Sequence, residues 1–111
     1  MVKVASIDLG SNSTRMLIAD ITNGNITTIY KEHQVTRMAD KLSESKIISK
    51  EATKRVLKVL AGYFKTINKN NVENIQIVGT AALRDAKNSQ EITQLIEKKF
   101  GFEVDIVSGE E

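Results

Sequence analysis

The chain has 111 residues, the size of one small domain, and its hydrophobic content of 41% is enough to build a core. Its 16 basic residues nearly balance its 14 acidic ones, so bulk charge gives no reason to expect a nucleic-acid partner. The absence of cysteine excludes disulfides and thiolate metal sites, and a single histidine argues against a histidine-based metal site. No apolar stretch has the length of a membrane span and no signal-peptide pattern opens the chain, so we expect a cytoplasmic protein.

The first third of the chain predicts three strands. Residues 2–9 form an apolar run, and residues 14–21 and 25–34 alternate between apolar and polar side chains. Asn23-Gly24 separates the last two runs and favours a type I′ turn, because both positions of that turn need positive φ. We therefore expect an antiparallel meander. His33 lies in its third strand, where we expect it to be exposed or packed rather than catalytic.

The middle of the chain predicts a loop and then a long helix. The loop covers residues 36–48, and Ser49 caps a helix over about 49–68. Apolar residues repeat on this helix at the spacing of one buried face: Val56, Leu60, Tyr63 or Phe64, and Ile67.

The last third predicts a strand, a second helix and a final strand. The first strand covers residues 75–78. Asn88, followed by a glutamate three positions later, resembles a capping box that opens a helix over about 89–99, and Gly101 ends it. Residues 102–107 then form the last strand. The helix is expected to be buried through Ile92, Leu95 and Ile96.

The predicted order is βββαβαβ, which indicates an α/β fold with a five-stranded mixed sheet and strand order 3-2-1-4-5. The first, fourth and fifth strands would be parallel, so their carboxyl ends, at Asp8, Thr80 and Ser108, should converge. Residues 108–111 follow without a terminal element, which leads us to expect a fragment of a longer protein.

The clearest chemical motif follows the first strand. Asp8 precedes a turn of small polar residues, Gly10, Ser11, Asn12 and Ser13. Glycine lets backbone N–H groups and hydroxyls approach an anion closely, and an aspartate beside such a turn can hold hydrated Mg²⁺ next to phosphate. The turn therefore predicts a phosphate-binding site. An ordinary β-hairpin rich in turn-forming residues is the alternative that this short motif leaves open.

Arginines near the strand ends are candidates for binding phosphate, because a guanidinium pairs with two phosphate oxygens at once. They are Arg15, Arg37 and Arg84. Each could instead be a solvated surface charge, or form a local ion pair such as Arg84 with Asp85. Glu110 and Glu111 could act near phosphates as a general base on water, or simply be solvated.

Together these motifs resemble the exopolyphosphatase / guanosine pentaphosphate phosphohydrolase family. The similar runs are residues 5–15, 35–37, 79–88 and 106–111, in the family's order and with its spacing. The resemblance implies the ribonuclease H-like fold shared by actin, heat-shock-protein-70 and sugar kinases. Residues 1–111 would be the N-terminal part of its first lobe, and the second phosphate loop and second lobe are absent from this chain.

The family resemblance also implies an activity. Its members remove terminal phosphate from inorganic polyphosphate or guanosine pentaphosphate with Mg²⁺, which connects them with the stringent response. The implied partners are polyphosphate or guanosine penta- or tetraphosphate. The resemblance further implies a homodimeric full-length protein, with no nucleic-acid or membrane partner. The isolated 111-residue chain should be inactive, because one phosphate loop is missing.

The resemblance assigns roles residue by residue. Asp8 would belong to the first phosphate loop, Arg15 would contact phosphate or nucleotide, and Arg84 would line the same cleft. Together with the chemistry of the motifs, this leads us to expect that Asp8 holds the metal and that phosphate is bound by Gly10, Ser11, Asn12, Ser13, Arg15, Arg37, Thr80 and Arg84. The family's catalytic glutamate is the second glutamate of a Gly-x-Glu-Glu-Ala run. Aligning Gly109 with that glycine makes Glu111 the first glutamate, so Glu111 is the base only if the alignment moves by one position.

Two other functions remain open on this fold. One is a sugar or acetate kinase, against which the run of residues 79–88 argues. The other is a non-enzymatic, nucleotide-dependent assembly protein.

Overall fold

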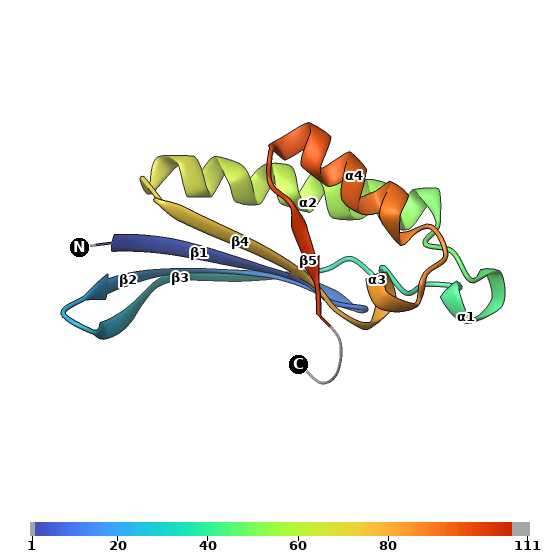
Figure 1. The fold of residues 1–111 in the computed structure, drawn as a ribbon, viewed down its shortest axis with the longest axis horizontal. Helices are drawn as coiled ribbons and strands as arrows, with labels where there is room; N and C mark the ends of the chain where they lie inside the picture. Colours follow the sequence, from blue (N-terminus) through green and yellow to red (C-terminus); the bar gives the residue numbers. More distant parts are fainter. Residues whose placement is uncertain (1, 108–111) are drawn as a thin grey trace.

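Five strands form one mixed sheet in the order β3-β2-β1-β4-β5, the predicted order. The computed structural model describes residues 2–107. Its elements are shown in Figure 1: β1 (Val2–Leu9), β2 (Ser13–Thr22), β3 (Asn25–Val35), α1 (Leu42–Ser45), α2 (Lys50–Lys69), β4 (Asn74–Gly79), α3 (Ala81–Asp85), α4 (Ser89–Phe100) and β5 (Val104–Ile106).

The meander and the parallel pairing are both confirmed. β1 to β3 pair antiparallel, and β1 pairs parallel with β4, with Asp8 opposite Val78. Asn23 and Gly24 have φ values of 52° and 79°, as a type I′ turn requires. The register of β2 and β3 shifts between Ile18 and Ala19. Such a bulge increases the local twist of the β2–β3 hairpin.

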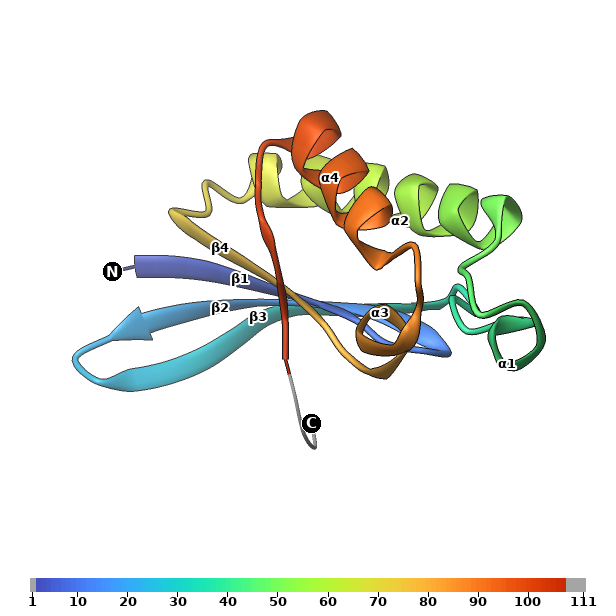
Figure 2. The ribbon, with the colours of Figure 1, turned by 45° about the vertical axis from the view of Figure 1, so that its right-hand side comes forward.

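Helices α2 and α4 cover one face of the sheet, and no helix of residues 2–107 covers the other (Figures 1 and 2). Ser49 caps α2 as predicted, since its hydroxyl accepts a hydrogen bond from the Ala52 N–H at 3.0 Å. The buried face of α2 is Ala52, Val56, Leu60, Tyr63 and Ile67. It packs on alternate residues of β1 and β2, which places the core between helices and sheet.

The segment predicted as a plain loop has more structure than expected. It contains the one-turn helix α1, flanked by Lys41 and Lys46 in the left-handed region, and it buries Met38 and Ile48 almost completely. The short helix α3 also went unpredicted. Helices of four or five residues show no apolar periodicity, so the sequence pattern could not reveal them.

The capping box at Asn88 is a wrong prediction. Its side chain makes no cap bond and pairs instead with the main chain of Ile48, with the amide oxygen accepting at 2.9 Å and the amide nitrogen donating at 3.0 Å. Leu95 was expected to be buried but is 41% exposed, because only a narrow stripe of α4 reaches the core. The last strand is shorter than predicted, because β5 pairs only with the carboxyl-terminal half of β4.

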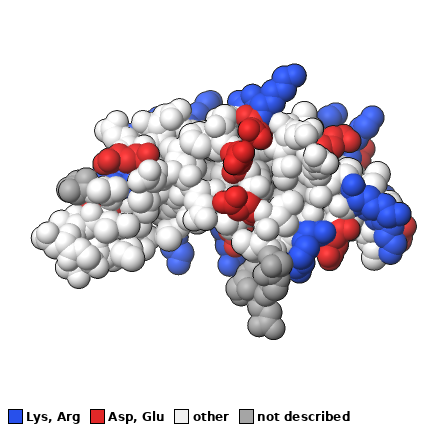
Figure 3. Space-filling model, viewed as in Figure 1, with Lys and Arg blue, Asp and Glu red and all other residues white. Residues whose placement is uncertain are grey.

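The surface carries mixed charge. Figure 3 shows basic and acidic side chains interspersed on this face, as the nearly balanced composition suggested. Within residues 2–107, none of the helices is both long enough and apolar enough to cross a membrane.

Replacing Asn88 tests its role as a clamp on the segment before α2. Asn88→Ala should lower the free energy of unfolding by about 1–3 kcal/mol, since both main-chain groups of the buried Ile48 lose a partner. Asn88→Asp should also destabilise, because its carboxylate would face the Ile48 carbonyl. Urea denaturation measures both, with Asn68→Ala on the exposed side of α2 as control. An unchanged free energy of unfolding in Asn88→Ala would contradict the role of Asn88 as a clamp.

Candidate functional site

The turn between β1 and β2 is closed by one short main-chain contact. The Gly10 N–H donates to the Ser13 carbonyl at 3.0 Å, and a Cβ added at Gly10 would lie 2.9 Å from that oxygen. Only glycine fits this approach without a shift of the turn. The side chains of Ser11, Asn12 and Ser13 make no hydrogen bond within residues 2–107, so they can bond a ligand. We call residues 10–13 the phosphate turn, after the ligand that the sequence analysis expects there.

A second segment lies against the phosphate turn. The Asn12 carbonyl accepts from the N–H groups of both Thr36 and Arg37 at 3.0 Å, and the Ser11 carbonyl accepts from the Ala39 N–H at 3.0 Å. Arg37 has a φ of 50° and an exposed side chain. The structure therefore brings Arg37 to the phosphate turn, as the sequence analysis expected.

Parallel pairing of β1 and β4 places Thr80 next to the end of β1. The Thr80 N–H donates to the Leu9 carbonyl at 3.2 Å, and its hydroxyl lies 3.4 Å from the same oxygen. Thr80 is 5% exposed, so its hydroxyl is directed into the protein. The expected convergence of the first and fourth strand ends is confirmed, while Ser108 lies outside the described residues.

Arg84 extends from α3 toward β5. Its Nη1 donates to the Val107 carbonyl at 3.1 Å, and its Nε lies 3.9 Å from a carboxylate oxygen of Asp85. The side chain is about one-third exposed. Arg84 thus occupies the strand-end edge that Thr80 and the phosphate turn also occupy, and it takes part in the local ion pair that the sequence left as an alternative.

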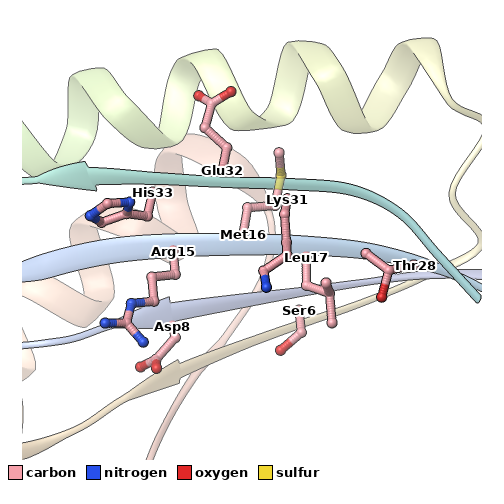
Figure 4. A pocket seen from close by; sticks show the side chains of 9 residues that line it. All are labelled: Ser6, Asp8, Arg15, Met16, Leu17, Thr28, Lys31, Glu32 and His33. Atoms are coloured by element: carbon pink, nitrogen blue, oxygen red, sulfur yellow. The ribbon is translucent and has the colours of Figure 1, made fainter.

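Asp8 and Arg15 lie opposite each other on β1 and β2, on the sheet face that lacks helices. They line a cavity of about 630 Å³, which we call the sheet-face pocket (Figure 4). One carboxylate oxygen of Asp8, Oδ1, is buried and has no hydrogen-bond partner within the described chain. A buried carboxylate oxygen without a partner is costly, so it marks a place for a donor or a cation.

This aspartate fits a hydrated magnesium ion. Within residues 2–107 there is no group of three or more metal-ligating side chains, so the protein alone offers no enclosed metal cage there. Mg²⁺ keeps several waters and often takes only one or two carboxylates plus phosphate oxygens. An aspartate beside a turn of small polar residues has the chemistry that such a site needs. Glu111, the remaining candidate, lies outside the described residues.

A buried polar cluster supports the phosphate turn from behind. The hydroxyls of Thr14 and Thr36 lie 2.9 Å apart, and both residues are fully buried. The Tyr63 hydroxyl donates to the Thr14 carbonyl at 2.7 Å. Burial raises the pKa of Tyr63 to about 12, so this hydroxyl stays protonated and donates at neutral pH. The cluster joins α2 to β2 and to the segment after β3.

Arg55 completes this support and went unnoticed in the sequence. Its Nε donates to the Thr36 carbonyl at 2.8 Å and its Nη2 to the Arg37 carbonyl at 3.3 Å, while Asp40 lies 4.0 Å away. One side chain therefore fixes two of the three residues whose N–H groups bond to the phosphate turn. Nothing in its sequence position distinguishes it from the other cations of α2, because its partners are main-chain carbonyls 18 and 19 residues away.

Known proteins resemble this chain in sequence. Residues 17–111 match the model of the Ppx/GppA phosphatase family. The chain belongs to this family. It is 35% identical over 108 residues to a putative exopolyphosphatase of Haemophilus influenzae, and 37% identical over 107 residues to a guanosine-5′-triphosphate,3′-diphosphate pyrophosphatase of Aliivibrio fischeri. These alignments cover 97% and 96% of this chain, but only 33% and 22% of the relatives.

Solved structures agree with this placement. The Ppx/GppA family member of Aquifex aeolicus superposes with a TM-score of 0.92 at 32% identity, over 96% of this chain and 35% of that one. RuvC of Thermus thermophilus, at 12% identity and a TM-score of 0.55, shares the fold alone. The fold class expected from the sequence is therefore confirmed, and the chain spans about a third or less of the length of these Ppx/GppA relatives.

Removing Arg55 tests the support of the phosphate turn. Arg55→Ala should lower the free energy of unfolding by about 1–3 kcal/mol, because the carbonyl of the buried Thr36 loses its donor. Arg55→Lys should recover part of this, since lysine keeps the charge but not the planar fork. Lys54→Ala, the neighbouring exposed cation, is the control and should change stability by less than about 0.5 kcal/mol. Equal effects at both positions would contradict the assignment.

Proposed function

We propose that this chain is the N-terminal part of the first lobe of a Ppx/GppA phosphohydrolase. The proposed full-length protein hydrolyses terminal phosphoanhydride bonds of inorganic polyphosphate, guanosine pentaphosphate or both. The observation that supports it most is the phosphate turn, tight enough to require Gly10 and adjacent to the unpartnered oxygen of Asp8, in a domain of a phosphatase family. Family membership argues against the kinase and assembly-protein alternatives.

In this proposal the chain's residues bind and orient the terminal phosphate. The hydroxyls of the phosphate turn donate to phosphate oxygens, and the guanidinium groups of Arg15 and Arg37 compensate their charge. Bound Mg²⁺, held by Asp8 through water, would supply further charge neutralisation on the phosphate. Placement of the phosphate relative to an attacking water is the main source of rate in phosphoryl transfer. The homodimer, the cytoplasmic location and the role of Glu111 remain predictions.

Phosphate release by the full-length protein tests the proposed function directly. We expect Mg²⁺-dependent release of orthophosphate from polyphosphate or guanosine pentaphosphate, and no significant release by the 111-residue chain, which offers groups to only one side of the phosphate. Absence of release by the full-length protein from both substrates would overturn the proposal. Release by the purified short chain, free of contaminating phosphatase, would show that one side is sufficient.

Asp8→Asn tests the metal role in the full-length protein. It keeps the size of the side chain and removes the charge that attracts the cation. We expect the protein to fold, activity to fall about 10- to 100-fold, and the half-saturating Mg²⁺ concentration to rise. Asp20→Asn, a carboxylate on β2 that bonds Thr22, is the control. Coincident Mg²⁺ titration curves for Asp8→Asn and the unaltered protein would leave Asp8 a purely structural residue.

Arg84 can bind phosphate or form only local contacts, such as its ion pair with Asp85, and kinetic measurements separate these two roles. If it binds phosphate, Arg84→Ala should lower kcat/KM by about tenfold or more and Arg84→Lys by less, because lysine cannot pair with two oxygens. Asp85→Ala is the matched control, since it removes the ion pair and keeps the guanidinium. A loss in Asp85→Ala as large as in Arg84→Ala would show that Arg84 acts through its ion pair with Asp85 and not by binding phosphate.

A further inference from the structure

Arg37 has a main-chain conformation that residues with a side chain rarely adopt. Its φ is 50°, in the left-handed region, where a Cβ crowds the neighbouring carbonyl oxygen and glycine alone avoids that cost. Five non-glycine residues of the described chain have positive φ, and two of them are asparagines, which tolerate this region. Strained conformations persist only where the surrounding structure holds them, and they cluster at ligand sites. The conformation of Arg37 therefore requires a support.

The support comes from hydrogen bonds to the main chain on both sides of the Arg37 Cα. The Arg37 N–H donates to the Asn12 carbonyl at 3.0 Å, which joins it to the phosphate turn. The Arg37 carbonyl accepts from the Asp40 N–H at 3.0 Å and from Nη2 of Arg55 at 3.3 Å. The carbonyl of Thr36, in the preceding peptide plane, accepts from Nε of Arg55 at 2.8 Å. Because Arg55 is bonded to both peptide planes that flank this Cα, one side chain holds the φ and ψ angles of Arg37.

The strained conformation gains no internal contact for the Arg37 side chain. That side chain is exposed, and within residues 2–107 its guanidinium forms no hydrogen bond or ion pair. A glycine at this position would keep the main-chain bonds without the steric cost. The guanidinium is therefore left available to a ligand beside the phosphate turn, where a phosphate would accept its paired N–H groups.

Arg55 is suited to hold Arg37 rather than to bind the phosphate itself. Its Nε and Nη2 atoms are occupied by the two carbonyls, and a carboxylate oxygen of Asp40 lies 4.0 Å from Nη2. The planar fork of a guanidinium reaches two acceptors at once in a fixed geometry, which the ammonium of lysine does not. Arg55 thus acts as a support whose donors are directed to main-chain oxygens.

We propose that Arg55 is a positioning residue, which holds the strained main chain of Arg37 so that the Arg37 guanidinium binds a phosphate oxygen at the phosphate turn. This inference rests on the proposed function, which places the terminal phosphate there. Without the Arg55 bonds, Arg37 can relax toward an ordinary conformation with negative φ, which changes the direction of its side chain. Arg55 touches no substrate and acts only through Arg37.

A double-mutant cycle in the full-length protein tests this coupling. Arg55→Ala should lower kcat/KM for phosphate release about tenfold, and Arg37→Ala by at least the same factor. The protein with both substitutions should match Arg37→Ala alone to within about twofold, because Arg55 then has no guanidinium to position. Lys54→Ala, an exposed cation of the same helix, is the control and should leave kcat/KM unchanged with Arg37 or Ala at position 37. Each assay is made well below the unfolding temperature of its variant.

Two further variants separate position from charge and strain. Arg55→Lys keeps the charge and one donor, so it should lose less of kcat/KM than Arg55→Ala, and it replaces Arg55→Ala in the cycle if that variant does not fold. Arg37→Gly removes the strain together with the guanidinium. It should unfold at a higher urea concentration than Arg37→Ala, while both variants show the same reduced kcat/KM.

The outcomes separate this inference from the proposed function. Independent, multiplying losses of kcat/KM in the double variant would overturn the inference, because Arg55 would then act on the substrate by itself. An unchanged kcat/KM in Arg55→Ala would also overturn it, and so would equal urea midpoints for Arg37→Gly and Arg37→Ala. These results leave the proposed function intact, because it requires only phosphate release by the unaltered protein. No release from polyphosphate or guanosine pentaphosphate would overturn both.

Discussion

The site depends on a small set of buried hydrogen bonds behind the phosphate turn. Thr14, Thr36 and Tyr63 lie on different elements, and each is almost completely buried with its hydroxyl bonded within the cluster. Because buried polar groups are costly when unpaired, this cluster permits few alternative arrangements of β2, the segment after β3 and α2. Arg55 adds donors to main-chain carbonyls of the same segment. The phosphate turn is thus held by a scaffold that includes no expected ligand-binding side chain.

The two faces of the sheet carry different kinds of side chain. The face under α2 and α4 carries apolar residues such as Ile7, Met16 and Ile18 and forms the core. The other face carries Asp8 and Arg15, whose charges are not neutralised by hydrogen bonds or ion pairs within residues 2–107. Since successive residues of a strand point to opposite faces, β1 and β2 place apolar residues in the core and charged residues on the other face at alternate positions. Substitutions one position apart should therefore differ sharply in their consequences.

Membership of the Ppx/GppA family explains why the described site occupies only one edge of the domain. The chain spans 33% of the Haemophilus influenzae relative and 35% of the Aquifex aeolicus structure, so most of such a protein lies outside it. Phosphoryl transfer requires groups around the whole phosphate. The phosphate turn, Arg37 and Arg84 all lie at the carboxyl ends of the parallel strands, the edge where ligands bind in open α/β sheets.

The sequence by itself determined the order of the main elements, the strand order and the tight turn at residues 10–13. These follow from local patterns: an apolar run in β1, alternation in β2 and β3, one apolar stripe on α2, and a run of small polar residues after β1. Only the tertiary structure decided how Asn88, Arg55 and the unpartnered Asp8 oxygen are placed. The sequence pattern predicts Asn88 as a local helix cap, but its hydrogen-bond partner, Ile48, lies 40 residues away. Bonds to distant main-chain groups leave no periodic trace in a sequence, because any main chain offers the same donors and acceptors.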